Sequence, residues 1–286
     1  MGKLLRWTAY GLGGLLALLL VAAAAVFVLS ESKLRKRYDA EAERLPPTPA
    51  SAAGIAEAAR MAKVHGCSSC HGEGLTGHVM DIPAFVARVV APNIPEIAAR
   101  ASDQQLAAAI RQGIGHDGRA LYIMPSPQYS RFTDAETAAL IAWIRTLPRG
   151  GGVSGKMSPG PMGRLELAGG GFESSRDLVA TYRQQVPLTL AGFEKGRHIA
   201  ATGCAECHGP ALYGQENAFG PAPDLRVAAG YDLDQFKTLL RHGVTPGGKP
   251  LGIMADVAKE GLTHLTDAEI AALHAYLQAR AKKLGT

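Results

Sequence analysis

A five-residue pattern of cysteine, two variable residues, cysteine and histidine occurs twice in the 286-residue chain, at 67–71 and at 204–208. Two cysteines three positions apart lie on one side of a helical turn, where their sulfurs can form thioethers to the two vinyl groups of a haem. The histidine that follows is then placed to bind the haem iron. The pattern therefore predicts two covalently attached haem c groups. The predicted attachment residues are Cys67, Cys70, Cys204 and Cys207, and the predicted iron ligands are His71 and His208.

Zinc is the alternative occupant of such cysteine pairs, because C-x-x-C also opens zinc sites. A zinc ribbon needs a second cysteine pair or a histidine pair close by in the sequence, and each pair here stands alone. The two motifs use all four cysteines of the chain. None is left for a disulfide or for a thiol nucleophile.

Internal repeats decide the domain organisation. Residues 110–124 match 240–254 at a spacing of 130, and residues 134–140 match 267–273 at a spacing of 133. The cysteine motifs are 137 apart, so the spacing drifts by only a few residues and the two halves are copies of one fold. Each copy should end in a helix opened by a Thr-x-x-Glu capping box. No alternating pattern of strand length appears, and we predict an all-α fold.

The chain should therefore divide into five segments, of which the fourth is rich in Gly and Pro and lacks periodicity apart from a short helix near 177–185. The segments are a transmembrane anchor with its basic flank (1–38), a proline-rich spacer (39–51), a first haem domain (52–148), a linker (149–189) and a second haem domain (190–286).

The amino-terminal segment carries no charge from residue 8 to residue 29. A helix of this length rises about 33 Å, enough to cross a hydrocarbon core of roughly 30 Å. A cleaved signal peptide is the alternative, because basic residues precede the apolar run. The length of the run, the lack of a clean small-x-small cleavage site and the basic residues directly after it favour an uncleaved anchor.

The net charge of +5 is confined to the same segment. Residues 1–38 hold six Lys or Arg and one acid, so the other 248 residues balance at 30 − 6 = 24 basic against 25 − 1 = 24 acidic residues. The basic composition is therefore no argument for a nucleic-acid partner. Anionic lipid headgroups are the natural partner of a charge that lies beside a membrane span.

Met124 and Met254 are the candidates for the sixth iron ligand, since they lie at equivalent places in the two repeats, 57 and 50 residues after the first haem cysteine. A haem closed by methionine is tuned for electron transfer, because the thioether favours reduced iron. The alternative is that each methionine fills the core. Pro125 follows Met124 and stiffens the loop, whereas Ala255 follows Met254. His242 and His264 are the rival ligands for the second haem.

On these motifs the two halves resemble class I c-type cytochrome domains, over about residues 52–148 and 190–282. The whole chain resembles membrane-anchored dihaem cytochromes c, including the cytochrome subunits of periplasmic alcohol-type dehydrogenases. The resemblance implies a haem crevice between three main helices. It also implies that a proline carbonyl holds the proximal histidine, and Pro92 and Pro223 match that turn, with Asp224 in place of the usual Asn.

Two further pairs of residues match between the repeats. The resemblance implies a small residue where the first and last helices cross, and Ala59 and Gly196 fit that position. Arg111 and Arg241 are matched cations, and we leave two roles open for them: pairing with haem propionates, or lying on a solvated helix face.

The resemblance also places haem attachment outside the bacterial cytoplasm. The positive-inside rule predicts the opposite orientation, since four basic residues follow the span and two precede it. The haem motif outweighs this count, because charge only biases orientation whereas the cofactor chemistry is a requirement. We therefore expect a single-pass protein of the bacterial inner membrane with its haem domains in the periplasm.

The expected function is one-electron transfer between a membrane or periplasmic donor and a respiratory acceptor, with no catalytic residues. The redox partners would be proteins such as a dehydrogenase, a quinol-oxidising complex or a terminal oxidase. Two alternatives remain open. One is a haem enzyme, such as a dihaem peroxidase or a thiosulfate dehydrogenase, which needs an iron with an open or replaceable ligand. The other is the electron-accepting subunit of a multi-subunit dehydrogenase.

Overall fold

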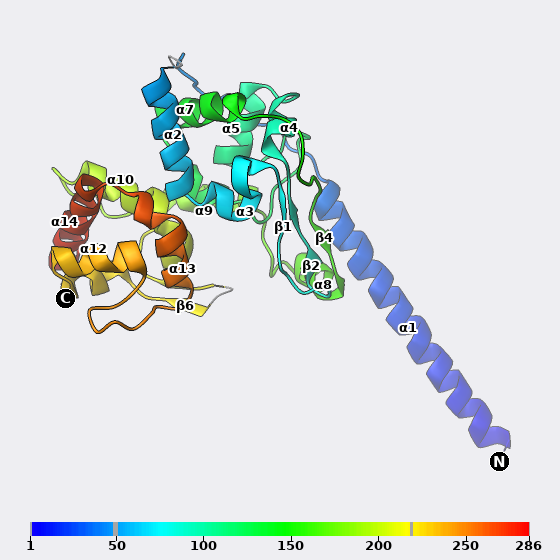
Figure 1. Ribbon diagram of the computed structural model, residues 1–286. Coiled ribbons are helices and arrows are strands. Elements are labelled where there is room, and N and C mark those ends of the chain that lie inside the picture. Colours follow the sequence, from blue (N-terminus) through cyan, green and yellow to red (C-terminus); the bar gives the residue numbers. More distant parts are fainter. Residues whose placement is uncertain (1, 48–50, 218–219, 286) are drawn as a thin grey trace.

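The computed structural model describes residues 2–47, 51–217 and 220–285. Its most distinct feature is a long helix, α1 (Gly2–Arg35), which projects away from two packed helical units (Figure 1). By length and composition α1 is able to cross a membrane, and its apolar residues are exposed along most of its length. The predicted span 8–29 lies within this helix.

The first unit is built from helices around the first cysteine motif. Buried apolar side chains from these helices form one core, which includes Leu106, Tyr129 and Leu140. Ser102 and Thr133 close capping boxes at the starts of two of the helices, as the sequence predicts for the second of them. The helices are α2 (Ala52–Val64), α3 (Cys67–His71), α4 (Ile94–Ala98), α5 (Asp103–Gln112), α6 (Ser126–Tyr129) and α7 (Asp134–Thr146).

The second unit repeats this arrangement with a longer final helix. Its first and last helices cross at Gly196, where an added Cβ would collide with the carbonyl oxygen of Ala272. The small residue expected at this crossing is therefore required by close backbone approach. The helices are α10 (Glu194–Gly203), α11 (Ala205–His208), α12 (Leu233–His242), α13 (Ile253–Glu260) and α14 (Asp267–Leu284), with 3₁₀ helices η2 (Leu225–Gly230) and η3 (Leu262–His264) between them.

The segment between the units is more ordered than the sequence predicts. It contains two helices, α8 (Pro161–Gly169) and α9 (Ser175–Gln184), where only a helix near 177–185 was expected. Leu167 of α8 and Val179 of α9 are buried. Tertiary packing therefore stabilises helices that the local Gly and Pro content does not indicate. The expectation of an otherwise irregular linker is therefore wrong for α8.

Strands are limited to three antiparallel pairs of two or three residues each in the described part of the chain. This short pairing leaves the all-α description intact, since helices make both cores. The pairs are β1 (His78–Val79) with β3 (Val90–Ala91), β2 (Ala87–Arg88) with β4 (Ser158–Pro159), and β5 (Gln215–Asn217) with β6 (Gly220–Ala222).

The two units pack together through equivalent elements. The capping-box glutamate of each final helix binds a basic side chain on the first helix of the other unit: Glu269 lies 2.9 Å from Arg60, and Glu136 lies 2.8 Å from His198. Val64 of α2 also packs into the core of the second unit. The interface thus approximates the two-fold contact of a dimer, made within one chain.

Candidate haem sites

The first cysteine motif forms the short helix α3, directly after α2. Gly66 adopts a left-handed conformation (φ 68°) that turns the chain between the two helices. His71 Nδ1 lies 2.9 Å from the carbonyl oxygen of Pro92, which leaves Nε2 for a metal ion. Burial lowers the pKa of His71. The carbonyl of Pro92 therefore holds the imidazole in one orientation, as the predicted role of His71 requires.

The second motif has the same geometry. Helix α11 follows α10 after Cys204, and His208 Nδ1 lies 2.8 Å from the carbonyl oxygen of Pro223. Burial lowers the pKa of His208 as well. Both predicted prolines thus lie at hydrogen-bond distance from the predicted ligands, and orienting an iron ligand remains their predicted role.

The four cysteines are half-buried, and no disulfide joins any of them. Burial raises the pKa of Cys67 and of Cys204 to about 12, so both thiols are protonated near neutral pH. Within the described ranges, no group of three or more His, Cys, Asp or Glu side chains forms a metal cluster.

Each candidate methionine lies against the same apolar core as the first cysteine of its motif. Met124 and Cys67 both pack against the core of the first unit, and Met254 and Cys204 both pack against the core of the second. Of the rival ligands, His242 is exposed at the end of α12, and His264 lies in η3 with its carbonyl oxygen accepting from Arg60. This placement favours Met254 over His242 as the sixth iron ligand of the second haem.

The donor set in each unit fits haem c: two thiols three positions apart, an imidazole with one free nitrogen, and a thioether beside the same core. When bound, such a group supplies reversible one-electron chemistry at iron. The half-buried cysteines and methionines sit between buried apolar side chains and solvent, as a crevice with an accessible edge requires.

A comparison with protein families decides between haem c and zinc as the group that these cysteine motifs hold. The family model for cytochrome c matches the chain twice, over residues 55–148 and 193–281. The chain belongs to the cytochrome c family. Both units are therefore cytochrome c domains, which implies haem c in each.

A curated relative extends the comparison beyond the domains. The cytochrome is 26% identical to the fructose dehydrogenase cytochrome subunit of Gluconobacter japonicus, over 83% of its own length. The match spans 55% of that relative, so the cytochrome covers about half the length of the protein that it resembles.

The matched arginines already have partners within the cytochrome. Arg111 Nη1 lies 2.7 Å from Asp134 Oδ1 and 2.9 Å from Glu43 Oε2. Arg241 lies 3.0 Å from Asp267 and donates to the carbonyl oxygen of Thr263. Asp134 and Asp267 begin the final helices, so both arginines tie α5 or α12 to the start of the final helix. This arrangement favours a structural role over contact with haem propionates.

One buried cation beside the second motif was missed by the comparison of repeats. Arg280 is 1% exposed, and its Nη1 donates to Asp224 at 2.9 Å. Its Nη2 donates to the carbonyl oxygens of Ala211 and Leu212, just after His208. The sequence indicates its burial only through spacing: Arg280 lies three residues after Leu277 and seven after Leu273, on the buried face of the final helix.

Helix α6 connects the two motifs. Its Gln128 accepts a hydrogen bond from the backbone N–H of Glu206, within the second motif, at 2.8 Å. Its Tyr129 hydroxyl donates to the carbonyl oxygen of His65, two residues before Cys67, at 2.5 Å. The spacing of the two motifs therefore depends on one short helix that begins directly after Met124 and Pro125.

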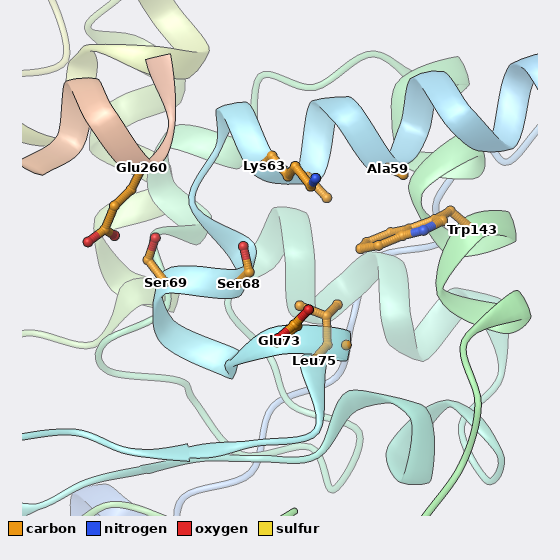
Figure 2. A pocket seen from close by; sticks show the side chains of 10 residues that line it. Ala59, Lys63, Ser68, Ser69, Glu73, Leu75, Trp143 and Glu260 are labelled. Atoms are coloured by element: carbon orange, nitrogen blue, oxygen red, sulfur yellow. The ribbon is translucent and has the colours of Figure 1, made fainter. Parts of the chain in front are cut away.

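A cavity of about 420 Å³ opens beside the first motif (Figure 2). Ser68 and Ser69, the variable residues of the motif, line it together with Lys63 of α2 and Trp143 of α7. Glu260, from α13 of the second domain, completes the rim. The segment that would carry the first haem is thus reached from solvent where the two domains meet.

Proposed function

We propose that this cytochrome is a dihaem electron carrier of the bacterial inner membrane, with both haem domains in the periplasm. The observation that carries the proposal is the repetition of the whole donor set. In each domain a histidine bound to a proline carbonyl follows a pair of thiols, and a methionine packs on the same core. Two complete sets in one chain favour a relay over an enzyme, which would need one iron with an open position.

The residues of each site have distinct roles in this proposal. The cysteines attach the porphyrin, and His71 and His208 bind iron through Nε2 while the carbonyls of Pro92 and Pro223 hold Nδ1–H. Met124 and Met254 close the sixth position and exclude exogenous ligands. The apolar cores behind them keep water from the iron, which limits the reorganisation that accompanies electron transfer.

The partner that we propose is a dehydrogenase that hands its electrons to this cytochrome. The relative whose name describes a dehydrogenase cytochrome subunit supports this role. The cavity beside Ser68 and Ser69 gives a donor access to the first motif, and α6 then sets a short separation to the second motif. The substrate chemistry would belong to another chain, so the cytochrome itself has no catalytic residues in this proposal.

Retention of α1 as an anchor is supported by its contacts with the folded domains. Lys33 Nζ donates to the carbonyl oxygen of Leu167 at 2.7 Å, and Glu31 lies 3.2 Å from Arg164. Leu167 is fully buried. Removal of α1 would expose this side of α8 and leave these polar groups without their partners.

The haem assignment is tested on the purified full-length protein by the pyridine haemochrome assay and by visible spectroscopy. We expect two covalent haems per chain and a long-wavelength sulfur-to-iron band in the oxidised form. Met124→Ala and Met254→Ala should each remove about half of that band, and Met162→Ala, an exposed methionine of α8, should leave it unchanged. A single covalent haem, or a band that survives both ligand substitutions, would overturn the assignment.

The partner is tested by purifying the cytochrome from detergent-solubilised membranes of its own host. A dehydrogenase subunit should co-purify at equal stoichiometry and should reduce both haems when its substrate is added. Reduction by the quinol pool alone, with no dehydrogenase bound, would contradict the role as a dehydrogenase subunit while leaving the dihaem carrier intact.

A further inference from the structure

The hairpin that follows the haem motif is longer in the first domain, where β1 pairs with β3, than in the second, where β5 pairs with β6. Gly77 and Gly214 directly precede the first strands, whose first residues pair with Ala91 and Ala222. From Gly77 to Ala91 the first domain advances 14 positions, whereas from Gly214 to Ala222 the second advances 8. The additional residues extend beyond β1 and β3 and reach along α1 (Figure 1). We call residues 81–88 the tip. Its one aromatic side chain, Phe85, is 60% exposed.

The tip is firmly joined to α8. The N–H of Gly160 donates to the carbonyl of Val86 at 2.9 Å, and the N–H of Met162 donates to the carbonyl of Phe85 at 3.0 Å. An added Cβ at Gly160 or at Gly163 would collide with tip carbonyl oxygens. Because only glycine permits this approach, the tip and α8 behave as one unit.

Helix α8 is in turn fixed to the end of the apolar run of α1. Arg164 donates to Ser30 Oγ at 2.9 Å, and its guanidinium lies 4.3 Å from the centre of the Phe27 ring. The uncharged run ends at residue 29, so these contacts lie where a spanning helix leaves the hydrocarbon. The depth of α8 relative to the bilayer is thereby set by α1.

The exposed side of this unit carries large apolar side chains beside the charged residues Asp81, Arg88 and Glu166. Met162 and Leu165 lie three residues apart on α8 and are 46% and 54% exposed, while Gly163 and Leu167 form the buried face. With Phe85, whose carbonyl accepts from the N–H of Met162, they give three exposed large apolar side chains on the joined tip and α8. A surface of this kind marks an interaction site.

We propose that the tip and α8 form a second membrane contact, in which Phe85, Met162 and Leu165 enter the headgroup region of an anionic bilayer. The inference rests on the proposed insertion of α1. Continuity with α1 identifies lipid as the occupant, since a surface fixed at the end of the span meets the bilayer first. The basic residues after the span provide the complementary charge for anionic headgroups; they are Lys33, Arg35, Lys36 and Arg37.

The contact has a consequence for electron transfer. A single helix leaves the domains free to rotate about the membrane normal and to tilt. A second contact at the tip fixes the tilt, so the first motif keeps a constant height above the bilayer. This arrangement suits a carrier that must meet a membrane-bound partner in one orientation.

The test uses the full-length cytochrome in nanodiscs made from equal parts of phosphatidylglycerol and phosphatidylcholine. A photoreactive benzoylphenylalanine replaces Phe85, Leu165, Leu18 or Val227 in separate variants, and mass spectrometry detects adducts with lipid. All four side chains are exposed, so folding should be retained, which an unchanged visible spectrum verifies. Leu18 reports on the span, and Val227, in the second domain, is the aqueous control.

We expect lipid adducts at positions 18, 85 and 165, each several-fold above position 227. Adducts at 18 alone would overturn the membrane contact while leaving the anchor intact. Lipid adducts at none of the four positions would contradict both the anchor and the contact. Adducts of 85 and 165 with a protein subunit rather than lipid, when the same variants are irradiated in native membranes, would also overturn the contact.

Discussion

The two domains hold their proximal histidines by the same proline turn but stabilise that turn by different chemistry. In the first domain Asn93 follows the proline, is 1% exposed, accepts from the N–H of Glu96 at 3.1 Å and donates to the carbonyl of Gly151 at 3.0 Å. In the second domain Asp224 takes that place and lies 2.9 Å from Arg280 and 2.8 Å from Arg226. A neutral amide is thus replaced by an ion pair between a half-buried carboxylate and a buried guanidinium.

The difference shows what a charged residue requires at this position. Asn93 is satisfied by backbone groups, one of them from the segment that follows the first domain. Asp224 needs a cation, and Arg280 supplies it from the buried face of α14 while also binding two carbonyl oxygens after His208. Burial raises the pKa of Asp224, but the hydrogen bonds from Arg280 and Arg226 and the charge of Arg280 together outweigh it and leave that pKa below its usual value. Substitutions at these positions should therefore affect the two domains unequally.

Arg280→Leu should have the largest effect. It leaves the half-buried Asp224 with only the more exposed Arg226. It also removes the side-chain donor to the carbonyls of Ala211 and Leu212, of which, among the described residues, only Leu212 keeps a backbone donor, the N–H of Leu225. Removing one partner of such a pair costs about 3 kcal/mol. We expect the second domain to unfold at lower denaturant concentration and the first to be unchanged, as measured by guanidinium titration of the two haem signals.

The matched control for this substitution is Lys283→Leu, an exposed cation near the end of the same helix. It removes a positive charge that has no buried partner. We therefore expect almost no shift in the guanidinium unfolding transition of either domain. Equal destabilisation by both substitutions would mean that helix end effects, not the ion pair, hold the turn.

Arg280 marks the limit of what could be predicted from the sequence about the haem sites. The cysteine motifs and the capping boxes of the two final helices could be predicted, because each is a local pattern that occurs in both halves. The proline turns were expected only from the resemblance to class I c-type cytochromes. Arg280 occupies the position of Leu147 in the first domain, so a comparison of repeats passes over it. Helix α8 was missed for a related reason: its Gly- and Pro-containing sequence is stabilised by contacts with α1, through Arg164 and Lys33, that lie more than a hundred residues away.

Asp224→Asn should have an intermediate effect, of about 2 kcal/mol, because it leaves the buried Arg280 without its carboxylate while the two carbonyl acceptors remain. The double substitution Asp224→Asn with Arg280→Leu recreates the chemistry of the first domain. We expect it to cost less than the sum of the two single changes, as measured by a double-mutant cycle on the same denaturant transition.

The reciprocal control is Asn93→Asp in the first domain, where no arginine occupies the position of Arg280. The buried carboxylate would have no cation there, so the first domain should lose stability and the second should not. Additive single and double effects in the second domain would contradict direct coupling between Asp224 and Arg280.

Acidification should produce the smallest difference between the domains. The pKa of Asp224 is lowered in the folded state, so its contribution to stability is present above the unfolded value of about 3.9 and is lost as the pH falls through the folded value. Asn93 does not titrate. Below about pH 4, the second domain should therefore lose stability more steeply than it does in the Asp224→Asn, Arg280→Leu double variant. Other carboxylates titrate in both proteins and cancel in this difference, so parallel pH profiles would show that the pair is not linked to the stability of the turn.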